Sequence, residues 1–126
     1  MKEIKLTIQI NKPVSDVFVF TLDPKNTPLY VNSILEEETN EWPVKLGTIY
    51  RNRKDNSEWS EYGVIEFKEN ETFTLQKKDG SLLVRYAFKP IRNNKTEFEY
   101  YVKSNTEFDE YFIKGIVEKL KTVIEE

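Results

Sequence analysis

The sequence contains no cysteine and no histidine among its 126 residues. Without cysteine, the chain cannot form disulfides, thiolate zinc sites or a cysteine nucleophile. Without histidine, it lacks the most common general acid–base and the most common metal ligand, which excludes a Ser-His-Asp triad. Any catalysis would depend on Asp, Glu, Lys or Tyr. No loop shows calcium-type spacing, so we expect neither a metal ion nor a cofactor.

Long apolar runs and basic clusters are missing as well. No segment approaches the roughly 20 apolar residues of a membrane helix, and the start, MKEIKLTIQI, does not resemble a secretory signal. The net charge is -3, from 19 basic and 22 acidic residues, so nucleic acid is not an expected partner. The short acidic run Glu36-Glu37-Glu38 is interpreted as solvated surface. The lack of cysteine is consistent with the cytoplasm, the location we expect.

Aromatic residues are plentiful: the chain has 8 Phe, 7 Tyr and 2 Trp. Its length predicts one domain over residues 1–126. A chain of this size buries roughly two-thirds of its unfolded surface, which is enough for a real core. The aromatic residues supply much of the apolar surface for that core.

The first third of the chain predicts a strand followed by one or two short helices. Apolar and polar residues alternate from Ile4 to Ile10, as in a half-buried strand. Pro13 suits the first turn of a helix, and residues 14–22 carry apolar side chains at helical spacing. Asp23-Pro24 is expected to end this helix, and residues 27–34 to form a second short helix or a turn.

Turn signals divide the centre of the chain into a meander of strands. The dipeptides Asp79-Gly80 and Asn93-Asn94 are hairpin or turn signals. Strands are expected over residues 44–55, 57–68, 72–78, 82–88 and 98–102. From Phe108 onward, apolar residues recur at three- and four-residue steps, which predicts an amphipathic helix of four or five turns. Hairpin-linked strands covered by one long helix indicate an α+β fold with an antiparallel sheet.

The inward face of the strand at 57–68 is ambiguous. Trp59, Ile65 and Phe67 favour one face, whereas Tyr62 and Val64 favour the other. Glu61 and Glu66 fall on opposite faces of this strand unless Gly63 forms a bulge. A pair of carboxylates could carry out acid–base chemistry if one were desolvated, but they are not assigned as catalytic. By alternation with Tyr86, Arg85 is expected on the outer face.

The order of elements resembles that of the START-like (SRPBCC) superfamily, whose helix-grip fold includes plant pollen allergens and polyketide cyclase/dehydratase-like proteins. The segments that carry the resemblance are INKPVSDVFVFTLDPKN, KLGTIY, GVIEFKENETFTL and the C-terminal amphipathic helix. The resemblance implies a curved antiparallel sheet of about six or seven strands around the long C-terminal helix, with an apolar cavity between them. Members bind lipids, hormones or polyketides, and some catalyse cyclisation or dehydration.

Aromatic residues on the elements that should surround the interior are the candidate ligand-binding residues. Such side chains either fill the core or line a cavity, where an apolar body with one polar tip suits a small ligand. The candidates are Tyr30, Tyr50, Trp59, Tyr62, Tyr86, Phe88, Tyr100 and Phe112. Tyr30 is expected near the cavity mouth.

Three functions remain open from the sequence. The first is binding of a small, largely hydrophobic, lipid- or polyketide-like molecule without catalysis. The second is a cyclase/dehydratase-type enzyme, which predicts a buried Glu, Asp or Arg that converges with a tyrosine hydroxyl. The third is a protein-interaction module, with a homodimer as a possible assembly.

Overall fold

The computed structural model describes residues 2–55 and 58–126. Within them the chain forms seven strands and three helices in the order that the sequence predicts, with one additional strand, β2. The elements are β1 (Lys2–Ile10), α1 (Val14–Leu22), α2 (Thr27–Tyr30), β2 (Glu36–Thr39), β3 (Ile49–Arg53), β4 (Ser60–Lys68), β5 (Thr72–Lys77), β6 (Leu82–Ile91), β7 (Lys95–Ser104) and α3 (Glu110–Glu125).

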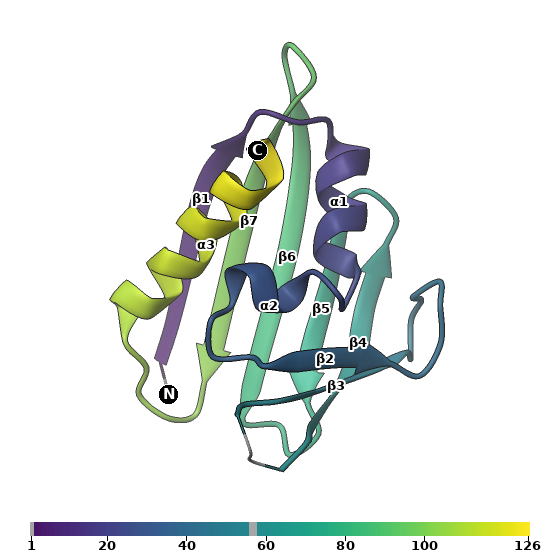
Figure 1. Ribbon diagram of the computed structural model, residues 1–126, viewed down its shortest axis with the longest axis vertical. Helices are drawn as coiled ribbons and strands as arrows, with labels where there is room; N and C mark the ends of the chain where they lie inside the picture. The colour runs from purple at the N-terminus through teal and green to yellow at the C-terminus, as the bar shows by residue number, and fades with distance from the viewer. Residues whose placement is uncertain (1, 56–57) are drawn as a thin grey trace.

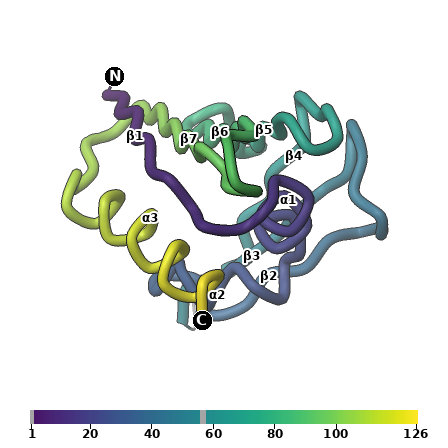
Figure 2. Tube along the Cα trace, turned by 90° about the horizontal axis from the view of Figure 1, so that it is seen from above, coloured from purple at the N-terminus to yellow at the C-terminus, as the bar shows by residue number. Residues whose placement is uncertain are grey.

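The strands form one antiparallel sheet in the order β1-β7-β6-β5-β4-β3-β2. All three helices lie on one face of this sheet (Figure 1), and the view from above shows the sheet curving around them (Figure 2). The predicted hairpin turns are present, because Gly80, Asn93 and Asn94 have the positive φ that such turns require. The α+β helix-grip architecture expected from the sequence is therefore confirmed.

The C-terminal helix α3 lies across the open side of the sheet and is fixed at both ends. Asp109 caps its N-terminus by accepting a hydrogen bond from the Tyr111 backbone N–H. Its buried face consists of Ile113, Ile116, Val117 and Leu120. Near the C-terminus, the Lys121 ammonium donates to the Gln9 carbonyl at 2.7 Å, which ties α3 to β1. At the other end, Lys2 of β1 donates to the Phe108 carbonyl at 3.0 Å, just before the helix.

Helix α1 packs on the sheet through an aromatic cluster. Pro13 occupies the N-cap, and Val17 and Phe18 are buried, as predicted from the spacing. The Phe18 ring meets the rings of Phe73 and Phe88 edge to face, with centroids 5.8 and 5.3 Å apart. This cluster fills the interior beneath α1.

A bulge in β4 resolves the ambiguous strand. The register with β5 shifts between Val64 and Glu66, rather than at Gly63. Tyr62 and Val64 before the shift, and Phe67 after it, all face the interior, and Ile65 is exposed. Ser57, the expected first residue of this strand, lies outside the described residues.

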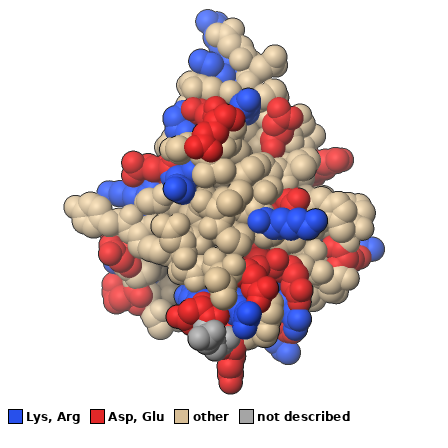
Figure 3. All heavy atoms as spheres, in the orientation of Figure 1, with Lys and Arg blue, Asp and Glu red and all other residues tan. Residues whose placement is uncertain are grey.

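The face that carries the helices is poor in charge at its centre. In Figure 3, uncharged atoms cover much of this centre, and acidic and basic side chains lie mainly toward the periphery. Exposed apolar residues on these helices include Val19, Leu29 and Phe112. Among residues 2–55 and 58–126, no helix has the length and apolar character needed to span a bilayer.

Candidate functional site

A pocket of about 300 Å³ lies between the sheet and the helices α2 and α3. Its apolar walls come from the inner face of β5, β6 and β7 and from the N-terminal half of α3. The residues that form these walls include Leu75, Leu82, Val84, Val102, Phe112, Ile113 and Ile116. Ser33, Lys54 and Glu107 contribute to its rim, so the pocket combines an apolar interior with a mixed polar border.

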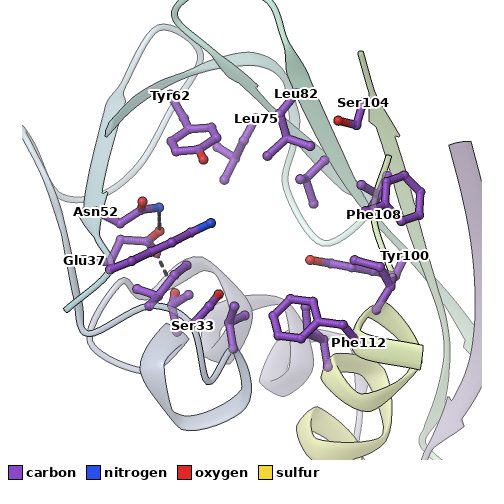
Figure 4. Close-up of a pocket in the computed structure, with 18 of the residues that line it drawn as sticks. Ser33, Glu37, Asn52, Tyr62, Leu75, Leu82, Tyr100, Ser104, Phe108 and Phe112 are labelled. Atoms are coloured by element: carbon purple, nitrogen blue, oxygen red, sulfur yellow. Dashed lines mark hydrogen bonds between the residues drawn. The ribbon is translucent and has the colours of Figure 1, made fainter. Parts of the chain in front are cut away.

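One carboxyl group reaches into the pocket. Glu37 of β2 accepts hydrogen bonds from the Thr27 hydroxyl at 2.6 Å and from the Asn52 side-chain amide at 2.9 Å. Figure 4 shows Glu37 and Asn52 on one side of the pocket. Burial raises the pKa of Glu37 above its ordinary value, and the two hydrogen bonds only partly oppose this effect. The carboxyl group is thus held in place by neutral donors in a poorly hydrated environment.

Three tyrosine hydroxyl groups share this pocket with Glu37. Tyr62 and Tyr100 point their hydroxyl groups into the open space in Figure 4, and Tyr86 also lines the pocket. Burial, with a contribution from the nearby Glu37 carboxylate, raises the pKa of Tyr62 to about 12. Burial also raises the pKa of Tyr86 and of Tyr100. These hydroxyl groups therefore remain protonated at neutral pH and can donate hydrogen bonds.

Four of the eight predicted residues line this pocket, and the other four do not. Tyr62, Tyr86, Tyr100 and Phe112 are in the lining. The remaining four are Tyr30, Tyr50, Phe88 and Trp59, of which the first three are buried in the core.

The hydroxyl groups of two core tyrosines donate hydrogen bonds to backbone carbonyls. Tyr30 lies in the core rather than at the pocket mouth, and its hydroxyl donates to the Thr21 carbonyl at 3.4 Å. The Tyr50 hydroxyl donates to the Leu22 carbonyl at the end of α1. Both residues therefore connect the helical segment after β1 to the interior.

Trp59 lies outside the pocket, on the opposite face of the sheet. It is 36% exposed, and the guanidinium groups of Arg51 and Arg53 lie over its ring at 4.4 and 5.4 Å. These arginines pair with Glu38 and Glu36. Trp59 precedes the β4 bulge, so its alternation with Phe67 does not indicate a shared face. Its role is cation–π packing on the outer surface.

The other charged candidates also lie on the outer face. Glu66 accepts a hydrogen bond from the Thr74 hydroxyl at 2.7 Å and pairs with Arg85 at 3.2 Å. Glu61 pairs with Lys78 at 3.6 Å. Glu61 and Glu66 thus lie on one face because of the bulge, but that face is away from the pocket. The outward placement expected for Arg85 agrees with the structure.

The interpretation of Glu36-Glu37-Glu38 as solvated surface is wrong for its central residue. In β2, Glu36 and Glu38 point outward to Arg53 and Arg51, while Glu37 faces Asn52 across the strand pair. Neither Glu37 nor Asn52 was among the predicted site residues. The sequence does hold a signal for this arrangement: residues 36–38 read EEE, and residues 51–53 read RNR. If the two segments pair, the outer glutamates meet the two arginines on one face of the sheet, and Glu37 meets Asn52 on the other face.

Solved structures with the same fold exist at low sequence identity. Protein CV1439 from Chromobacterium violaceum has a TM-score of 0.77 at 12% identity, covering 100% of this chain and 99% of that chain. Protein MLL2253 from Mesorhizobium loti has a TM-score of 0.76 at 12% identity, covering 98% and 97%. Ara h 8.0201 has a TM-score of 0.67 at 11% identity, also covering 98% and 97%.

At such identities, structural similarity is evidence of fold and not of a shared ligand or reaction. No family model matches the sequence, and no curated protein matches it either. The similarity extends over nearly the whole of each chain and includes the curved sheet and the long C-terminal helix. By its structure, the chain has the helix-grip fold of START-like proteins.

Proposed function

We propose that this protein binds a small, largely hydrophobic molecule, lipid- or polyketide-like, in the pocket between the sheet and α3. The observation that supports this is the pocket itself, which has apolar walls and a few convergent polar groups. Its volume of about 300 Å³ is at the lower end of the range typical of ligand sites. Because the walls are mostly aliphatic and aromatic, removing an apolar molecule from water would supply most of the affinity.

Filling the pocket tests this proposal. Val84 lines the pocket, whereas Leu83, the preceding residue of β6, lies on the opposite face of the strand. Val84→Phe should place a ring in the ligand space, and Leu83→Phe is the matched control. Native mass spectrometry of the purified wild-type protein should detect a co-purified small molecule that Val84→Phe lacks and Leu83→Phe retains. Equal retention by both variants would contradict binding in this pocket.

A second candidate function is an enzyme of the cyclase/dehydratase kind. The observation that favours it is the convergence of the Glu37 carboxyl with the hydroxyl groups of Tyr62 and Tyr100 in one pocket. A carboxyl group with a raised pKa is suited to proton transfer, and a protonated tyrosine can donate to a developing oxyanion. In this reaction, Glu37 removes a proton beside a carbonyl group that Tyr62 or Tyr100 polarises and returns it to the departing β-hydroxyl group, which leaves as water.

The variant Glu37→Gln distinguishes an enzymatic function from simple ligand binding. Small β-hydroxy ketones incubated with the wild-type protein should lose one water, as detected by liquid chromatography and mass spectrometry. Because general acid–base groups contribute about 10²-fold or more, Glu37→Gln should slow this turnover by at least that factor. Turnover at the wild-type rate in Glu37→Gln would exclude Glu37 as the base.

A further inference from the structure

The charges that line the pocket are unevenly distributed. Among the lining residues that the structure describes, the acidic side chains are Glu37 and Glu107, and the basic one is Lys54. Lys54 and Glu107 are exposed, whereas Glu37 is partly buried, and Figure 4 shows it beside Asn52 in the pocket. A ligand that enters the pocket therefore meets a negative charge at its polar end.

The partners of Glu37 hold the carboxylate but do not neutralise it. Its two oxygens accept from the Thr27 hydroxyl and the Asn52 amide, both of which are neutral donors. A carboxylate offers about four lone-pair positions, so these two bonds leave acceptor capacity for a further donor. A positively charged donor would satisfy that capacity and also compensate the partly buried charge.

Aromatic rings surround the same space. Tyr62, Tyr100 and Phe112 approach it from β4, β7 and α3 in Figure 4. Aromatic faces attract cations, and this attraction strengthens when the cation is partly removed from water. The tyrosine oxygens can also accept hydrogen bonds from an ammonium group. A carboxylate beside several aromatic rings is the chemistry that recognises an amine.

We propose that the pocket selects a small hydrophobic molecule that carries a protonated amine, with the ammonium group bound to Glu37 and the apolar body against β5, β6 and α3. This inference rests on the proposed binding function and adds the chemical class of the ligand to it. It also predicts what the pocket rejects. A ligand of the same shape with a carboxylate in place of the ammonium would bring two negative charges together in a poorly hydrated site.

Three probes with one carbon skeleton test the proposal: 4-phenylbutylamine, 4-phenylbutan-1-ol and 4-phenylbutyrate. Affinities are measured by NMR titration of the wild-type protein at neutral pH, with Leu75, Val84 and Ile116 as reporters of pocket occupancy. A charge-assisted hydrogen bond favours the amine over the alcohol by about tenfold or more, and the carboxylate should bind most weakly. Glu37→Gln should abolish the preference for the amine, so that the amine and the alcohol bind with similar affinity.

Glu61→Gln is the matched control, because it removes an equal charge from the outer face. It should retain the full preference. Equal binding of amine and alcohol by the wild-type protein would overturn the inference and leave the proposed function standing, and this comparison needs no variant. Failure of all three probes to shift the pocket reporters would overturn the proposed function, and the inference with it. An amine preference that survives in Glu37→Gln would also overturn the inference.

Discussion

Tyr50 and Tyr62 face each other across β3 and β4, yet the structure gives their hydroxyl groups different roles. Tyr50 is 1% exposed, and its hydroxyl donates to the Leu22 carbonyl. Tyr62 directs its hydroxyl into the pocket. Removing the two hydroxyl groups separately therefore distinguishes a residue that holds the fold together from one that is available to a ligand.

Tyr50→Phe leaves the Leu22 carbonyl without this donor at the buried end of α1. A buried polar group that loses its partner costs about 1–3 kcal/mol of unfolding free energy. A loss of about 2 kcal/mol corresponds to a melting temperature lower by roughly 6–10 °C for a domain of this size. Tyr62→Phe removes a hydroxyl that borders open space, so we expect a change within about 0.5 kcal/mol.

Urea denaturation followed by circular dichroism measures both unfolding free energies, and titration with the phenylbutyl probes measures binding. Tyr50→Phe should be less stable and bind normally once folded, whereas Tyr62→Phe should be stable and bind more weakly. Tyr101→Phe removes a hydroxyl that hydrogen-bonds Glu3 at the surface and is the control for simple loss of an oxygen. If Tyr62→Phe were as destabilised as Tyr50→Phe, the division between core and pocket hydroxyls would be wrong.

Three further predictions follow from other parts of the structure. Burial raises the pKa of Glu37 above 4.5, so between these two pKa values the folded state binds more protons than the unfolded state. The unfolding free energy of the wild-type protein, compared with that of Glu37→Gln, should therefore fall as the pH rises from 4.5 through the raised pKa. Urea denaturation at several pH values measures this difference. Phe18→Ala should cost about 3–5 kcal/mol in the same assay, because it empties the aromatic cluster, and the exposed Val19→Ala should cost under about 0.5 kcal/mol. Asp109→Ala removes the cap of α3 and should lower the melting temperature by an amount equivalent to about 0.5–2 kcal/mol.

Local patterns predicted the elements whose burial is periodic. The alternation from Ile4 to Ile10 and the proline before α1 identify β1 and α1, because each pattern is complete within its own segment. The resemblance to START-like proteins correctly indicated the helix-grip arrangement of these elements.

The missed features depend on distant partners. Glu37 faces the interior only because β2 pairs with β3, whose residues follow more than ten positions later. Trp59 and Phe67 lie on opposite faces because the bulge at Val64–Glu66 changes the parity of β4, and the bulge is defined by the pairing with β5. Periodicity within one segment carries no information about such register. Tyr86 and Tyr100 lie on β6 and β7, which pair in regular register, so alternation within each strand places both on the inner face beside the pocket.

The sheet is open, and its two edges, β1 and β2, are separated by the helices. Among the described residues, no backbone hydrogen bond joins α3 to α2, so these two helices contact each other through side chains alone. On its other side, α3 is fastened to β1 through Lys121, Glu125 and Lys2. Separating α3 from α2 would therefore break no strand pairing. Under the proposed binding function, we therefore expect the pocket to select ligands by their polar groups more strictly than by their size, because strand pairing fixes Glu37 and Asn52 whereas no backbone hydrogen bond fixes α3 against α2.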